Sequence, residues 1–131
     1  MDQQDENAGR APADGQALIV DDDPLVLELL SDVAIAAGLR PVACRSLSAA
    51  RDALAGPVPA VAILDDELPD GTGVDLAREL RSSRRLRGVR VLFCTSAEPK
   101  RRREIGRVAP VIRKPFALNE VERVMREAAG H

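Results

Sequence analysis

Aromatic residues are nearly absent from this chain of 131 residues, which has no tryptophan or tyrosine and only two phenylalanines, Phe93 and Phe116. Its core must therefore be built from leucine, valine, isoleucine and alanine. Proteins that bind single-stranded nucleic acids stack the bases on aromatic side chains, so the composition argues against that class. Histidine is as scarce: the single one, His131, is the last residue, which argues against a protein that carries a phosphoryl group on histidine.

Long apolar runs are missing as well. No stretch approaches the roughly 20 residues that span a bilayer, and the polar N-terminus lacks the apolar core of a signal peptide. Cys44 and Cys94 each lie in a short apolar run, which favours reduced, buried thiols over a disulfide. We therefore expect a cytoplasmic protein with no membrane partner, and a chain of this length predicts one folded domain.

The net charge of −2 is small but unevenly distributed. Residues 1–16 hold four acidic residues against one arginine and show no hydrophobic periodicity, so we predict a disordered acidic tail at 1–16 before a domain at 17–131. Arginines gather at 78–90 and at 101–103. The favoured interpretation is a solvated face that is balanced by the acidic tail, which could fold over it. The alternative is a surface for nucleic acid or an acidic partner, and nucleic acid is not expected because no pair of DNA-binding helices is evident.

Short apolar runs alternate along the chain with amphipathic segments. Strands are predicted at 17–20, 39–44, 60–64, 89–94 and 109–113. Helices are predicted from Pro24 to Gly38 with Asp23 as cap, from Ser46 through Leu54, at about 74–81, as a short or irregular fourth helix within 97–107, and from a cap at Asn119 with Glu122. The alternation indicates a doubly wound α/β fold with a five-stranded parallel sheet, in which Pro41 marks the second strand as an edge.

Polar residues follow four of the five predicted strands, at Asp21–Asp23, Asp65, Thr95–Ser96 and Lys114–Pro115. Ligands of open parallel sheets bind at the carboxyl ends of the strands, so we expect these four groups to share one site. Converging carboxylates repel one another unless a cation compensates them, and a hard cation such as Mg²⁺ suits them. Asp65 could then act as a nucleophile towards phosphorus, with Thr95 and Lys114 receiving phosphoryl oxygens.

The segments LIVDDDP, LDDELPDGTG, LFCTSA and IRKPF, read in this order and spacing, resemble the motifs of response-regulator receiver domains from two-component signalling. The resemblance covers roughly residues 16–129 and implies a flavodoxin-like strand order of 2-1-3-4-5. It implies that Asp65 is the phosphoacceptor. The implied ligands of Mg²⁺, or of Mn²⁺, are Asp21, Asp22, Asp65 and the backbone carbonyl of Glu67, and the implied phosphoryl-binding and switch residues are Thr95, Ser96, Lys114 and Pro115.

The resemblance also implies a phosphorelay. The phosphoryl donor would be a phosphohistidine on a sensor histidine kinase or a histidine phosphotransfer protein, docking around Val26, Leu27 and Phe116. Such a protein is not an enzyme in the usual sense, because it promotes its own phosphorylation and dephosphorylation. We expect a stand-alone switch without an output domain after residue 131, which acts through contacts with an unknown downstream protein.

Three features depart from the family pattern. Val111 stands where the family has an aromatic residue three positions before the lysine, and the basic segment 100–103 replaces an amphipathic fourth helix. Asp66 and Glu67 add acidic groups beside Asp65. We expect Glu67 to shorten the phosphorylated lifetime, so that Glu67→Gln would slow dephosphorylation.

Two other functions fit parts of the pattern. A phosphohydrolase of the haloacid dehalogenase type would use Asp21 and Asp23, but it needs an acidic pair after the lysine and no aspartate follows Lys114. Turnover of a phosphate ester would identify it. An adaptor of receiver fold that works without phosphorylation is the second alternative, and it would form no adduct with a phosphodonor.

Overall fold

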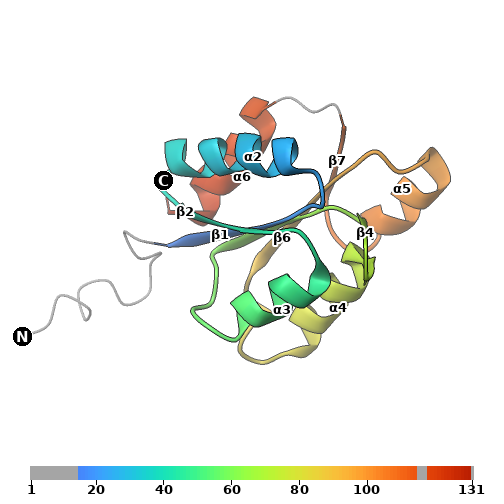
Figure 1. Ribbon diagram of the computed structural model, residues 1–131, viewed down its shortest axis with the longest axis horizontal. Helices are drawn as coiled ribbons and strands as arrows, with labels where there is room; N and C mark the ends of the chain where they lie inside the picture. Colours follow the sequence, from blue (N-terminus) through green and yellow to red (C-terminus); the bar gives the residue numbers. More distant parts are fainter. Residues whose placement is uncertain (1–14, 115–117, 131) are drawn as a thin grey trace, which may run out of the picture.

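The computed structural model describes residues 15–114 and 118–130. Within them, one parallel sheet contains β1 (Gln16–Val20), β2 (Arg40–Cys44), β3 (Val61–Leu64), β6 (Arg90–Thr95) and β7 (Val111–Arg113), in the order β2-β1-β3-β6-β7 (Figure 1). Counting only these strands, the order is the expected 2-1-3-4-5, and β2 is an edge. The doubly wound α/β fold is confirmed.

Helices cover both faces of the sheet. In Figure 1, α2 (Pro24–Ala36) and α6 (Leu118–Ala128) lie on one face, while α3 (Leu47–Leu54) and α4 (Gly73–Ser82) lie on the other. The short α5 (Pro99–Gly106) lies beside α4, towards the β7 edge. None of the helices in the described ranges is both long and apolar enough to cross a membrane.

Local sequence signals account for most helix boundaries. Asp23 accepts a hydrogen bond from the Leu25 amide, and Pro24 occupies the first helical position of α2, where its missing N–H is not needed. Ser46 caps α3 in the same way by accepting from the Ala49 amide. After α2, Gly38 adopts a positive φ of 86° that other residues rarely reach, so the chain can turn into β2.

Several element boundaries differ from those expected. After Asp65, β4 (Glu67–Leu68) and β5 (Gly71–Thr72) pair as a small antiparallel hairpin. The fifth strand of the sheet is shorter than the expected 109–113, since β7 begins at Val111. Asn119 does not cap α6: the helix already includes Leu118, because its register is set by burying Val121, Val124 and Met125 rather than by the polar cap signal.

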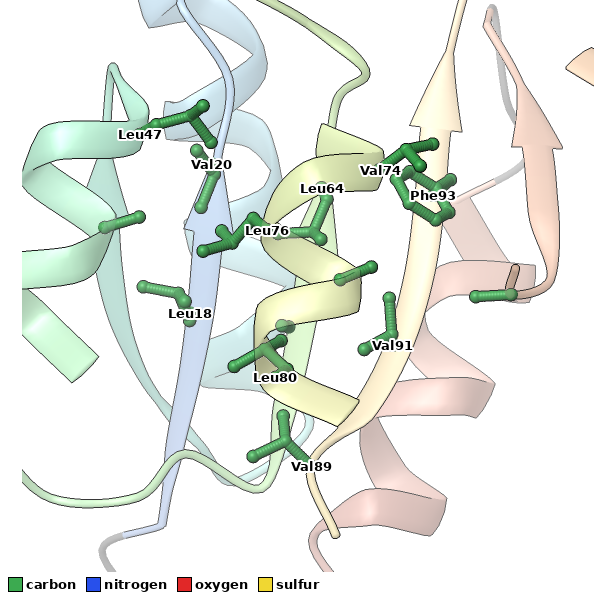
Figure 2. Packing of buried hydrophobic residues seen from close by; sticks show 14 of the residues in the cluster. Leu18, Val20, Leu47, Leu64, Val74, Leu76, Leu80, Val89, Val91 and Phe93 are labelled. Atoms are coloured by element: carbon green, nitrogen blue, oxygen red, sulfur yellow. The ribbon is translucent and has the colours of Figure 1, made fainter. Parts of the chain in front are cut away.

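Side chains of the central strands alternate between two apolar clusters. Leu18 and Val20 of β1 pack under α3 and α4, while Ala17 and Ile19 pack under α2 and α6. Figure 2 shows the first cluster, in which Phe93, Leu64 and Val91 of the sheet meet Val74, Leu76 and Leu80 of α4. Cys44 and Cys94 are buried and free, as expected.

Helix α5 is the weakly anchored element that the basic sequence predicted. Of its eight residues, all of them described, only Ile105 is buried. Its N-cap position, Glu98, makes no side-chain capping hydrogen bond. Few buried contacts therefore hold α5 in place against the rest of the domain.

Candidate functional site

The sheet register places two aspartates side by side. Val20 of β1 pairs with Leu64 of β3, so the next residues, Asp21 and Asp65, leave the sheet together at its carboxyl edge. Backbone bonds extend the ladder to these positions: the Asp65 amide donates to the Val20 carbonyl at 2.9 Å and the Asp21 amide donates to the Cys44 carbonyl at 3.0 Å. The parallel topology therefore makes one site from residues far apart in sequence.

Three carboxylates converge at this edge. One oxygen each from Asp21, Asp22 and Asp65 lie within 4.8 Å of one another. The Asp21 and Asp65 residues are buried, with exposed fractions of 2% and 8%, while Asp22 faces solvent. The cluster thus has a buried base and an open side.

Lys114 brings a positive charge to the cluster from the far end of β7. Its backbone amide donates to the Thr95 carbonyl at 2.9 Å, and its Nζ donates to Asp21 Oδ2 at 2.7 Å and to Asp65 Oδ2 at 3.3 Å. Burial by itself lowers the pKa of Lys114, but the hydrogen bond to Asp21 and the charges of Asp65 and Asp21 outweigh it, so the pKa is raised. The ammonium therefore stays charged.

Burial is the largest influence on the Asp65 carboxyl and raises its pKa, against the opposing charge of Lys114. The Asp21 carboxylate raises that pKa further. Three acidic groups thus face one ammonium, an imbalance that a divalent cation would correct. The donor set, all oxygen with one open side, fits Mg²⁺.

Thr95 is fully buried at the end of β6, and its hydroxyl oxygen accepts a hydrogen bond from the Ala97 amide at 3.1 Å. Ser96 is exposed. Pro115 and Phe116, which the sequence assigned to phosphoryl binding and to docking, lie outside the described residues.

The expected docking face on α2 needs a correction at Leu27. This side chain is 7% exposed and packs in the core, and Val26 is half-buried. Helical periodicity turns Leu25 and Leu29 outwards instead, with exposed fractions of 74% and 42%. The 3.6-residue period of the helix, counted from the buried Leu30, places Leu27 on the buried face and Leu25 and Leu29 away from it. The sequence could therefore have identified the two exposed leucines.

Asp66 holds a position that the sequence did not reveal. Although charged, it is 3% exposed, and its carboxylate accepts two hydrogen bonds from the Arg101 guanidinium at 2.8 and 3.1 Å. The Val74 amide also donates to it at 3.3 Å. The basic run 100–103 contains four candidates for such a partner, so only the fold could single out Arg101.

The hairpin after Asp65 is tied to its surroundings at two further points. Asp70 accepts hydrogen bonds from the Leu47 and Ser48 amides at 2.8 and 2.9 Å and so caps α3, and these bonds lower its pKa. Gly73 begins α4 so close to the Asp65 carbonyl that a Cβ there would lie 2.2 Å from it. Glu67 lies in β4 with its side chain exposed.

Comparisons with known proteins agree with this arrangement. The family model for the response regulator receiver domain matches residues 17–126. The chain is 34% identical over 115 residues to a probable transcriptional regulatory protein, TcrX, of Mycobacterium tuberculosis, covering 83% of this chain and 48% of that protein. It is 34% identical over 110 residues to the transcriptional regulatory protein GltR of Pseudomonas aeruginosa, covering 79% of this chain and 44% of that protein. The chain therefore spans about half the length of these curated relatives.

Among solved structures, the signal receiver domain of a DNA binding response regulator from Colwellia psychrerythraea superposes with a TM-score of 0.80. It is 18% identical, and the match covers 90% of this chain and all of the other, so this likeness concerns the fold alone. With the family match over most of the chain, the conclusion follows that this protein belongs to the response regulator receiver domain family and works in phosphorelay signal transduction, in which Mg²⁺ assists the phosphorylation of an aspartate.

Proposed function

We propose that Asp65 is the phosphoacceptor and that it receives its phosphoryl group from a phosphohistidine. One observation carries the assignment: Asp65 lies within the cluster of three carboxylates and also contacts the ammonium of Lys114. Asp66 is bound by Arg101 and Asp70 caps α3, so the neighbouring aspartates of this segment have structural partners.

In this proposal a divalent cation, Mg²⁺ or alternatively Mn²⁺, would be held by Asp21, Asp22, Asp65 and the backbone carbonyl of Glu67. When bound, the cation supplies positive charge that offsets the negative charge of the carboxylates and of the phosphoryl group. The solvent-facing Asp22 and the open side of the cluster leave room for its entry. The site is thus divided between a buried nucleophile and an exposed metal ligand.

During phosphotransfer, a carboxylate oxygen of Asp65 forms an O–P bond while the P–N bond to the donor imidazole breaks. The electron pair of that bond returns to the ring nitrogen, which can then take a proton. Lys114, already paired with Asp65, would bind a phosphoryl oxygen as a point charge. Thr95 would donate its hydroxyl hydrogen to another oxygen, and the exposed Ser96, together with Pro115, completes the proposed set of phosphoryl-binding and switch residues.

The donor would be a sensor histidine kinase or a histidine phosphotransfer protein in the cytoplasm. We infer that it docks near the amino end of α2, where Leu25 and Leu29 expose apolar surface beside Asp22. Phosphorylation of Asp65 adds about −1.5 to −2 charges, and the shifted conformational equilibrium would be read by a downstream protein. The protein acts as a phosphoacceptor that promotes its own phosphorylation and dephosphorylation.

Intact-mass measurement tests the assignment. The protein incubated with acetyl phosphate and Mg²⁺ should gain the mass of one phosphoryl group, and Asp65→Asn should gain none. Asp52→Asn, which removes an exposed carboxylate from α3, is the matched control and should gain it normally. An adduct on Asp65→Asn would refute the assignment, and a failure to form any adduct even with a phosphorylated histidine kinase would favour the adaptor.

A further inference from the structure

A groove of about 630 Å³ lies between α4 and α5, and four of its eight lining residues are arginines. Arg78 and Arg81 come from α4, and Arg101 and Arg107 come from α5 and its end. Glu104 is the acidic side chain among the lining residues. The two helices lie next to each other in Figure 1, so the fold combines two basic clusters that are separate in the sequence.

The positive charge of the groove is only partly balanced, by Glu104 in its lining and by Asp66, which pairs with Arg101. In the described part of the chain, Arg78, Arg81 and Arg107 take part in none of the ion pairs, whereas Arg123 and Arg126 on α6 each bind a glutamate. Three unpaired guanidinium groups around one hollow create a field that attracts anions. The convergence of these side chains on one hollow, more than the lack of ion pairs, distinguishes the groove from an evenly solvated face.

Arg101 shows how a guanidinium from this lining can pair with a carboxylate. Its guanidinium already holds the Asp66 carboxylate through two parallel hydrogen bonds, the geometry in which arginine recognises carboxylates. Asp66 directly follows Asp65, and Arg101 is half-buried at the side of the groove. One residue therefore belongs both to the groove and to the surroundings of the phosphoacceptor.

The spread of charge favours a peptide over a small anion. Arg101 and Arg107 are six positions apart, or about 9 Å along a helix, which equals about three residues of extended chain. Several acidic groups along one peptide match this spread better than a single phosphate does. Val74 and Val108 add apolar surface to the lining, which suits a segment that carries apolar as well as acidic side chains.

We propose that the groove between α4 and α5 docks an acidic segment of a partner protein, and that Arg101 links its occupancy to Asp65. The docking is independent of phosphotransfer, whereas the link rests on the proposed function. A phosphoryl group on Asp65 adds negative charge beside Asp66 and so holds the Arg101 guanidinium more firmly at Asp66, where it is less available to the groove. Phosphorylation therefore weakens docking, and by thermodynamic reciprocity a docked segment disfavours phosphorylation.

Docking is tested on the full chain with a fluorescein-labelled peptide in which glutamate alternates with leucine. Fluorescence anisotropy gives its Kd, and the same peptide with glutamine in place of glutamate should not bind. The double variant Arg78→Glu/Arg81→Glu should weaken binding at least about tenfold. Arg84→Glu/Arg87→Glu is the matched control, because it changes the charge equally at exposed positions outside the groove, and it should change Kd less than about twofold.

Circular dichroism confirms that the variants fold, and the milder Arg78→Gln/Arg81→Gln should show a smaller loss in the same direction. Equal effects of the two charge-reversed pairs would overturn the groove as the docking site. Displacement of the peptide by ATP or by oligothymidylate at lower concentrations than by unlabelled peptide would overturn the choice of occupant.

The link is tested by measuring peptide Kd before and after treatment with acetyl phosphate and Mg²⁺, with the adduct quantified by mass. Binding should weaken several-fold on phosphorylation. Asp66→Asn, which releases Arg101 from its anionic partner, should still bind the peptide but lose most of that dependence. Equal Kd values in phosphorylated and unphosphorylated protein would overturn the link, whereas absence of the adduct would overturn the proposed phosphoacceptor and leave the docking result standing.

Discussion

Neighbouring residues of one acidic segment have different surroundings and therefore different properties. Asp65 joins the carboxylate cluster, Asp66 is buried against Arg101, Glu67 faces solvent and Asp70 caps α3. Their chemical similarity in the sequence hides these differences. Each side chain acquires its role from the element that it meets after folding.

Gly73 is required by a close approach rather than by an unusual φ. A Cβ at this position would lie 2.2 Å from the Asp65 carbonyl oxygen and 3.1 Å from the Phe93 ring. We expect Gly73→Ala to push α4 away from β3 and to lower the free energy of unfolding by about 1–3 kcal/mol, measured by urea denaturation. It should also slow phosphorylation of Asp65.

Gly88→Ala is the matched control for this substitution. A Cβ at Gly88 has nothing within 4 Å, so we expect a stability change within about 0.5 kcal/mol. Similar losses for the two variants would show that the contact with Asp65 is not what requires glycine at position 73.

Cys94 predicts a pH dependence of stability. Burial raises the pKa of its thiol to about 12, against about 8.5 for a free cysteine. Between these values the folded state keeps a proton that the unfolded state loses, so the thiol makes stability fall as pH rises. The decline should reach at most about 1.4 kcal/mol per pH unit.

Urea denaturation of the protein and of Cys94→Ala at several alkaline pH values isolates this contribution. The variant loses packing at every pH, but its stability should decline less steeply with pH. Parallel declines for the two proteins would contradict a buried, neutral thiol at position 94.

At the scale of whole elements, α5 differs from the other helices. Its sequence is basic, Ile105 is its one buried residue, and Arg101 ties it to Asp66. Elements with few buried contacts open locally at a lower free energy than the global unfolding. One of the two helices that line the proposed docking groove is thus expected to open more easily than the well-buried helices.

Hydrogen exchange followed by mass spectrometry tests this difference. Amides of α5 should exchange faster than those of α2, and Arg101→Gln should accelerate exchange in α5 further because Asp66 no longer holds it. Arg126→Gln breaks an ion pair with Glu122 within α6 and should leave α5 unchanged. Equal protection of α5 and α2 would contradict the weak anchoring.

At the scale of the whole molecule, metal binding should stabilise the fold because the carboxylate cluster exists only in the native state. A cation at ten times its Kd would raise the free energy of unfolding by about 1.4 kcal/mol. Thermal unfolding in Mg²⁺ and in EDTA measures this difference. Asp22→Asn should reduce the Mg²⁺-dependent rise in Tm, while Asp52→Asn on α3 should preserve it.

If Mg²⁺ shifts the Tm of the protein and of Asp22→Asn equally, the cation stabilises the protein elsewhere. If it shifts neither, the cluster does not bind it. Either result would remove the metal from the proposed function.

Much of this architecture follows from local patterns in the chain. Continuous apolar runs such as 60–64 predict a strand covered on both faces, and Asp23-Pro24 predicts the start of a helix, because burial and capping act over a few residues. The polar residues after the strands likewise predict a common site, since parallel strands end at one edge of the sheet.

Tertiary structure alone decided which charges meet. Nothing local indicates that Arg101 rather than its neighbours binds Asp66, or that Asp70 caps α3. Such pairings join residues distant in sequence, and they depend on how helices sit against the sheet. Short-range periodicity determines the elements, whereas long-range packing determines their partners.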